Sequence, residues 1–217
     1  MIVAGIDVGG EKKGFHAVAL RDGQYLERTT SCDAAAMARW CRGLGARFVG
    51  VDAPCGWRVD ELRPAERQLK DCGISAFATP TEDQLENPFY GWMACGRKLF
   101  LALQAEGFAL FDGSGSQVGS LCFETYPQAV ACALKKQVVS ARGSQKRKIR
   151  RELLAERNLD LTELTNIDWI DAALCAVTSD DFARGEIVKI GEPGTGFIVV
   201  PRVPESKLFP ENLYAAS

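Results

Sequence analysis

The chain opens with a short run of apolar residues that stops at a carboxylate. Residues 2–6 are apolar or glycine, and Asp7 follows them directly. A continuous short apolar run is typical of a strand that is buried on both faces of a sheet. Residues 47–52 repeat the pattern and end on Asp52. We therefore predict two buried strands that each end on an aspartate.

The hydrophobic pattern of the remaining chain predicts a mixture of strands and helices. Further strands are predicted at 15–20, 24–30 and 121–124, with Asp22-Gly23 as a hairpin turn between the first two. Apolar residues three and four positions apart predict helices, which fall at 34–43, 64–70, 89–106, from Pro127 onward, 145–157 and 167–183. Residues 187–200 are predicted to form a C-terminal hairpin.

This order of elements resembles the ribonuclease H-like fold. That fold has a three-stranded antiparallel meander, a helix, a fourth strand beside the first, and then a fifth strand. The resemblance implies an α/β protein with a central mixed five-stranded sheet flanked by helices. The acids of such a fold meet at the ends of the first and fourth strands and on a late helix.

Composition sets the domain organisation. The chain has 217 residues, of which 47% are hydrophobic and 25% are charged, as in ordinary globular proteins. This length suffices for one well-filled domain. We expect a single domain over residues 1–217, with a helical insertion at about 53–119 and a C-terminal hairpin and tail at 186–217.

Composition also bears on the cellular location of the protein and on the types of catalytic or metal site it can have. No apolar run approaches the roughly 20 residues of a membrane helix, and the N-terminus lacks the pattern of a signal peptide. The eight cysteines include no C-x-x-C pair, which favours reduced thiols in a cytoplasmic protein over disulfides or a zinc site. His16 is the only histidine, so serine-histidine, cysteine-histidine and multi-histidine metal chemistry are not expected unless His16 itself serves.

Charge is unevenly distributed along the chain. The net charge is −2, yet residues 135–151 hold eight basic residues and no acid, which leaves −10 for the rest. Such a segment can bind phosphates electrostatically, or it can simply be a solvated basic face. We predict nucleic-acid binding, DNA or RNA, for its eight cations: Lys135, Lys136, Arg142, Lys146, Arg147, Lys148, Arg150 and Arg151.

The aspartates at the strand ends are candidates for chemistry. If the two strands are neighbours, Asp7 and Asp52 lie side by side, and their mutual repulsion raises one pKa unless a cation joins them. Binding of Mg²⁺ or Mn²⁺ is the simplest way to offset this repulsion, because hard cations prefer oxygen ligands. Asp168 and Asp171 are three residues apart and share a helix face. The alternatives are turn-capping aspartates at the strand ends and, for Asp168, an acid that complements the helix dipole.

Four motifs resemble those of a predicted-nuclease family that is catalogued mainly as a domain of unknown function. These motifs are Gly5-Ile6-Asp7-Val8-Gly9-Gly10, Val51-Asp52-Ala53-Pro54, Phe123-Glu124-Thr125-Tyr126-Pro127, and the run from Asp168 to Ala176. The last run is also similar to the closing Asp-x-x-Asp-Ala-Leu motif of Holliday-junction resolvases, with one extra alanine.

The resemblance implies a site and an activity. It implies metal ligands and catalytic residues at Asp7, Asp52, Glu124 and Asp171, and it admits Asp168 as a further ligand. The family also has an Arg-rich helix after the fourth strand, to which Arg63, Arg67 and Lys70 correspond, and we assign Arg67 to nucleic-acid binding. Two metal ions about 4 Å apart would then activate a water and stabilise the leaving oxygen of a phosphodiester.

Two other functions compete with a metal-dependent nuclease. Asp-x-Gly-Gly after a first strand also opens kinases and ATPases of the actin-like fold, but those proteins need two such domains and a second phosphate loop. The Gly/Ser-rich residues 112–119 are a poor second loop. The other alternative is a non-catalytic nucleic-acid-binding module that shares the fold.

Overall fold

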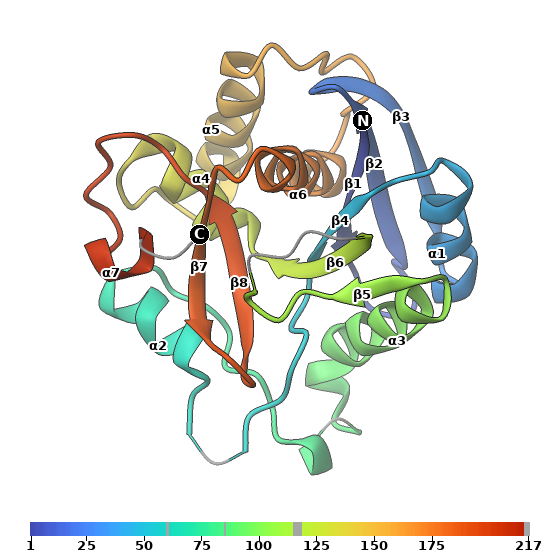
Figure 1. The fold of residues 1–217 in the computed structure, drawn as a ribbon, viewed down its shortest axis with the longest axis horizontal. Helices are drawn as coiled ribbons and strands as arrows, with labels where there is room; N and C mark the ends of the chain where they lie inside the picture. The colour runs from blue at the N-terminus through green and yellow to red at the C-terminus, as the bar shows by residue number, and fades with distance from the viewer. Residues whose placement is uncertain (60, 85, 115–118, 215–217) are drawn as a thin grey trace.

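The computed structural model describes residues 1–59, 61–84, 86–114 and 119–214, and Figure 1 shows their arrangement. Residues 115–118 of the Gly/Ser-rich segment 112–119, which bears on the kinase alternative, lie outside this range. Eight strands form one mixed sheet, so the predicted count of five is wrong. The strands are β1 (Ile2–Val8), β2 (Phe15–Arg21), β3 (Gln24–Ser31), β4 (Phe48–Asp52), β5 (Phe108–Leu110), β6 (Ser120–Thr125), β7 (Ile187–Glu192) and β8 (Gly196–Pro201).

The centre of the sheet follows the predicted order. β1, β2 and β3 form an antiparallel meander, and β4 lies parallel to β1 on its other edge. β6 continues the sheet parallel to β4, and the full order is β3-β2-β1-β4-β6-β8-β7. The mixed sheet and the meander are therefore confirmed.

The additional strands complete the free edge of β6. β5 pairs with the first half of β6, from Ser120 to Cys122, and β8 pairs with its last two residues, Glu124 and Thr125. The predicted hairpin over 187–200 exists as β7 and β8, but it extends the main sheet instead of lying apart from it. β5 has only three residues, too few for a periodic pattern to show.

Helices cover both faces of the sheet (Figure 1). One face carries α1 (Ala34–Gly43) and α3 (Gly91–Ala105), and the other carries α4 (Pro127–Lys135), α5 (Gly143–Glu156) and α6 (Ile167–Ala183). Shorter helices are α2 (Pro64–Asp71), η1 (Glu82–Gln84), η2 (Pro88–Tyr90) and α7 (Glu211–Tyr214). In the described parts of the chain, no helix is long and apolar enough to cross a membrane.

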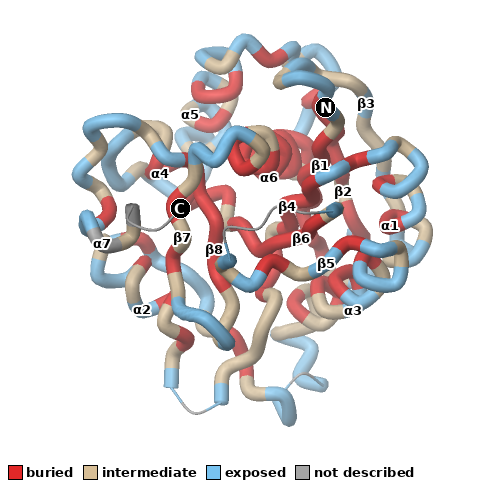
Figure 2. The backbone as a smooth tube through the Cα atoms, viewed as in Figure 1, coloured by how far each residue is buried: buried red, intermediate tan, exposed pale blue. Residues whose placement is uncertain are grey.

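Each face of the sheet has its own hydrophobic core. Ile6 and Val51 pack with residues of α1 and α3, whereas Val3, Phe48 and Phe123 pack against the α4–α6 side. Successive residues of a strand point to opposite faces, so this division follows from the sequence position alone. Figure 2 shows the central strands and α6 as the most continuously buried part of the molecule.

Helix α6 lies unusually close to the two central strands because glycines face it. A Cβ atom on Gly5 would overlap the backbone nitrogen of Ala176 and the backbone oxygen of Ala172. On Gly50 it would lie 2.9 Å from the carbonyl oxygen of Cys175. The Gly-apolar-Asp pattern that ends both strands therefore has a packing role for its glycine.

A buried serine fixes this contact. The backbone N–H of Gly50 donates to Oγ of Ser179 at 2.8 Å, and that hydroxyl lies 2.8 Å from the carbonyl oxygen of Ala4, to which it can donate. One side chain of α6 thus bridges β1 and β4. The helix is held in register with both strands.

We expect alanine at these glycines to destabilise the protein in proportion to the overlap. Gly5→Ala collides with backbone atoms and should lower the free energy of unfolding by about 3 kcal/mol, and Gly50→Ala by about 1–3 kcal/mol. Gly91→Ala, at a helical glycine with open space around it, should stay within about 1 kcal/mol of wild type. Urea denaturation measures all three, and equal stabilities for Gly5→Ala and Gly91→Ala would contradict the close contact.

Candidate acidic site at the ends of the central strands

Two aspartates lie side by side where the central strands end. Asp7 of β1 and Asp52 of β4 are register partners in the parallel pair. Both lie two residues after a glycine that faces α6, so their side chains point to the α6 face as well. The structure therefore brings together the two acids that the strand pattern singled out.

The first turns of α6 add two more acids. Asn166 caps the helix, and its side chain accepts a hydrogen bond from the N–H of Trp169 at 3.0 Å. Asp168 lies in the first turn and Asp171 lies one turn further, where it is buried. Because α6 packs tightly on β1 and β4, these acids face the strand-end aspartates.

Burial and the proximity of these acids raise the pKa of Asp7 and of Asp52. Burial, followed by the negative charges of Asp171 and Asp168, raises the pKa of Asp7 to about 7. Burial and the charges of Asp7 and Asp171 raise the pKa of Asp52 well above its usual range. Like charges in a poorly hydrated site disfavour each other's ionised form. The cluster formed by Asp7, Asp52, Asp168 and Asp171 is called the acidic site below.

Three cations partly offset this charge. Lys13, from the loop after β1, donates to Asp168. Arg150 of α5 is buried and pairs with one carboxylate oxygen of Asp171, and Nζ of Lys146 lies 3.2 Å from the other oxygen. The acidic site is therefore compensated by side chains of this chain.

The four acids are the right type of ligand for a hard divalent cation, but their side chains are not spaced to hold one in this structure. All four acids supply carboxylate oxygens, which Mg²⁺ and Mn²⁺ prefer. Among the described residues, however, no group of three or more His, Cys, Asp or Glu side chains is arranged to hold one ion. Asp171 is directed to Arg150 and Lys146, so a metal ion would compete with these two cations for its oxygens.

Glu124 lies on the opposite face of the sheet. Its register partner on β4 is Val51, whose side chain points toward α1 and α3. Both of its carboxylate oxygens accept hydrogen bonds from the guanidinium group of Arg63, at 2.7 and 2.9 Å, and one also accepts from the N–H of Cys55. These contacts do not support a metal-ligand role for Glu124, which stays a prediction.

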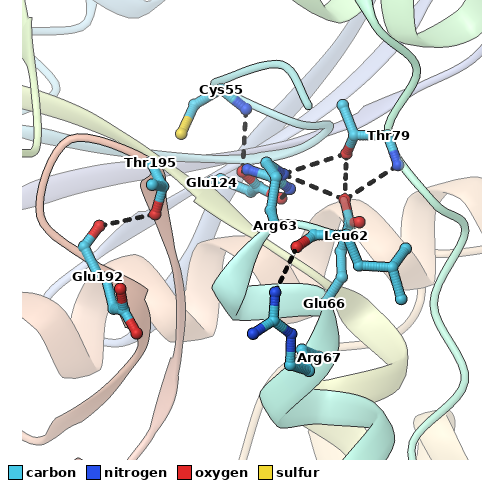
Figure 3. A network of polar contacts seen from close by, with 9 residues as sticks. All are labelled: Cys55, Leu62, Arg63, Glu66, Arg67, Thr79, Glu124, Glu192 and Thr195. Carbon is cyan, nitrogen blue, oxygen red and sulfur yellow. Dashed lines mark hydrogen bonds and ion pairs between the residues drawn. The ribbon is translucent and has the colours of Figure 1, made fainter. Parts of the chain in front are cut away.

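Glu124 belongs instead to a buried network that anchors loops (Figure 3). Arg63 also donates to Glu66 at 3.1 Å and to Thr79 at 3.2 Å. The backbone N–H and the hydroxyl of Thr79 both donate to the same Glu66 oxygen. The network ties α2, the end of β6 and the loop before η1 together. Nothing in the periodicity of the sequence signals it, because the partners are far apart along the chain.

The predicted nucleic-acid-binding residues are largely engaged within the chain. Lys136 and Arg142 are exposed. The others contact an acid or a backbone carbonyl: Arg67 with Glu61, Lys135 with Glu156, Lys148 with Glu152, Arg147 with Thr165, Arg151 with Leu164, and Lys146 and Arg150 with Asp171. Nucleic-acid binding by this segment stays a prediction, and two of its cations serve the acidic site.

His16 lies next to the acidic site. The sequence alone gave it no definite role. It is the register partner of Asp7 on β2, and its ring packs edge-on against Trp169 at 4.8 Å between centroids. Its Nδ1 atom is buried without a hydrogen-bond partner, and burial lowers the pKa of His16. Pairing the two strands of the meander residue by residue would have placed it beside Asp7.

Comparisons with known proteins add a family and one solved structure. The family described as "Protein of unknown function (DUF429)" matches residues 5–195. No curated protein matches the chain. A solved structure of RuvC from Thermus thermophilus is similar, with 15% identity and a TM-score of 0.48, over 89% of this chain and 99% of that chain. Because the matched family has no known function, the site must be interpreted from its own geometry.

The raised pKa of Asp7 makes a prediction about stability and pH. Between about pH 4 and 7 the folded protein keeps this proton while the unfolded chain releases it, so stability should fall as the pH rises through this window. Asp7→Asn removes the penalty and should be more stable than wild type at pH 7.5 without metal. The gain should shrink at pH 5.

Urea denaturation at the two pH values measures this difference. The control is Asp71→Asn, at an exposed aspartate that ends α2. A gain from Asp7→Asn that is equal at both pH values, or a loss of about 0.5–2 kcal/mol as for a removed cap, would indicate a structural aspartate.

A second prediction concerns Glu124. Glu124→Gln weakens the only contact that gives Arg63 two carboxylate oxygens, and it should lower the free energy of unfolding by about 3 kcal/mol. Glu61→Gln breaks an exposed ion pair with Arg67 and should cost less than about 1 kcal/mol. Stabilisation by Mn²⁺ should survive in both. A Glu124→Gln protein of normal stability that no longer responds to Mn²⁺ would instead make Glu124 a ligand.

Proposed function

The chain belongs to the DUF429 family of proteins of unknown function, and we propose that it is a divalent-metal-dependent nuclease that hydrolyses phosphodiester bonds. One observation carries the proposal: Asp7 and Asp52 are adjacent on parallel strands, and Asp171 is held against them in a buried site. Buried carboxylates that repel one another are the arrangement that a divalent cation relieves. A purely structural role would favour replacing some of them with neutral residues.

In this proposal Asp7, Asp52 and Asp171 would hold Mg²⁺ or Mn²⁺, with Asp168 as a further ligand. The bound metal would lower the pKa of a water and stabilise charge on the leaving oxygen. The protein's own contribution is to hold carboxylates from two strands and one helix on the same side of the sheet. Ligands on regular elements are more rigidly placed than ligands on loops.

Lys146 and Arg150 have two roles in this proposal. Without metal they compensate the charge of Asp171, which limits the repulsion among the acids. When a metal takes over that compensation, Lys146 is only half-buried and can turn toward a phosphate of the substrate. Arg150 is buried and also donates to the side chain of Gln128 at 3.0 Å, so it should stay in place.

The same ion pairs favour a second candidate. Arg150 and Lys146 could complete the charge balance permanently, and the protein would then bind nucleic acid without cleaving it. The two candidates differ in whether the acidic site takes up metal. The kinase alternative is favoured by no contact in the structure.

Metal binding should appear first as thermal stabilisation. Mn²⁺ binds the folded site and not the unfolded chain, so it should raise the Tm of the wild-type protein in a concentration-dependent way. Asp7→Asn and Asp52→Asn should lose most of this response, because each removes an anionic ligand. Asp71→Asn should keep it.

Cleavage by the same proteins decides between the two candidates. Labelled single- and double-stranded DNA and RNA are incubated with Mn²⁺ or with EDTA. We expect products only with metal, and none from Asp7→Asn. A wild-type protein that binds the labelled strands but shows neither a Tm response nor cleavage is a binding module, and a response that Asp7→Asn retains would remove Asp7 from the metal site.

A further inference from the structure

Four aromatic residues between β4 and the first turn of α3 form a cluster, two of them exposed and two half-buried, which we call the aromatic patch. They are Phe77, Phe89, Tyr90 and Trp92. Phe77 and Phe89 are 62% and 63% exposed. The ring of Phe77 lies 6.3 Å from those of Phe89 and Trp92, and Phe89 lies 5.0 Å from Tyr90. Exposed aromatic rings that gather in one place are typical of a binding surface.

The loops that carry the patch are anchored. Phe77 is two residues from Thr79, which is buried and bonded to Glu66 in the network of Figure 3. Phe89 lies in the turn η2, and its N–H donates to the side chain of the capping residue Asn87 at 3.0 Å. The rings are therefore presented on a fixed backbone, which lowers the entropy lost on binding.

The aromatic patch adjoins one acid of the acidic site. A small hollow at the carboxyl ends of β4 and β6 is lined by Asp52, Phe77 and Trp92, and also by the Arg63–Glu124 pair. A ligand that touches the rings of Phe77 and Trp92 thus lies next to the carboxylate of Asp52.

A second hollow joins the patch from the other side and carries lysines. Trp92 lines it too, together with Lys12, Lys13 and Lys98. Two acids, Glu11 and Glu86, also line it. Lys13 also contacts Asp168, which places this hollow beside the acidic site. The ring of Trp92 is therefore flanked by a hollow that carries Lys12 and Lys98 and by a hollow that contains Asp52.

From this continuity we propose that the aromatic patch stacks unpaired bases, and that the substrate is single-stranded nucleic acid or a strand with an unpaired segment. The inference rests on the proposed nuclease function and specifies its substrate. Bases within a duplex are stacked on one another and cannot reach protein rings, whereas bases of a single strand can. The phosphates of the same strand would lie along Lys12 and Lys98.

The alternation of rings and cations favours this occupant over an apolar one. A partner bound by hydrophobic contact alone gains nothing from lysines on one side of Trp92 and a carboxylate on the other. A nucleic-acid strand uses all three, since bases stack on rings, phosphates pair with lysines and the scissile bond faces the acids.

The test measures binding in EDTA, where cleavage cannot occur. Labelled single strands of DNA and of RNA are compared with hairpin duplexes of the same composition, for wild type and for Phe77→Ala/Phe89→Ala. We expect the single strand to bind more tightly, and the double variant to lose about tenfold or more, as for stacked bases. Leu101→Ala, at an exposed leucine of α3, is the matched control and should bind as wild type does.

Two further variants separate stacking from charge and from misfolding. Phe77→Trp keeps a ring and should restore most of the binding that Phe77→Ala loses. Lys12→Ala/Lys98→Ala should reduce the dependence of affinity on salt by about 1.4 in the logarithmic slope, since each phosphate contact contributes about 0.7 for single strands. Equal binding by wild type and Phe77→Ala/Phe89→Ala overturns the proposal, as does a preference for the duplex.

These outcomes are independent of the nuclease proposal. Loss of single-strand binding in Phe77→Ala/Phe89→Ala, with no cleavage by wild type under any metal, supports the aromatic patch and rejects the nuclease. Metal-dependent cleavage with no role for Phe77 and Phe89 rejects the patch and keeps the nuclease. Comparison of the DNA and RNA strands shows which of them the patch prefers.

Discussion

The structure depends on the close approach of one helix to two strands. α6 can lie directly on β1 and β4 only because Gly5 and Gly50 have no side chains there, and Ser179 then bonds to both strands. A helix resting on larger side chains would lie further from the sheet. The acids of its first turns would then be too far from Asp7 and Asp52 to affect them. The glycines thus control the site through packing.

Because these acids lie close together, the α6 side of the sheet needs basic residues to compensate their charge. Four acids in a small and partly buried space destabilise the folded state unless cations accompany them. α5 supplies Lys146 and Arg150 for this purpose, and the loop after β1 supplies Lys13. The basic segment that looks like a phosphate-binding surface in the sequence is therefore partly an internal counter-charge.

Sequence reasoning could predict what local pattern determines. Apolar runs that stop at Asp7 and Asp52 predicted acids near the ends of two strands, and helical spacing predicted Asp171 on the last long helix; β1 in fact continues to Val8, and Asp171 lies in the second turn of α6. Pattern could not show which strand edge β8 would choose, because pairing is a long-range choice between exposed edges. Nor could it show that Arg63 would take both oxygens of Glu124, since ion pairs between distant residues leave no periodic signal. Pattern therefore predicted the proximity of Asp7, Asp52 and Asp171, but not their pairing with cations or the separate position of Glu124.

Two neighbouring residues at the end of β6 point to opposite faces of the sheet. One face carries the acidic site, and the other carries the network that supports the aromatic patch. Its side chains alternate, so Thr125 faces the α6 side with the acidic site, and Glu124 faces the side of α1 and α3. Through Arg63 and Glu66, Glu124 holds the loop that presents Phe77. A register slip of one residue would exchange the two faces and lose both arrangements. The same strand end therefore keeps the aromatic patch and the acidic site at a constant distance from each other, which is what a strand of nucleic acid bound to both would require.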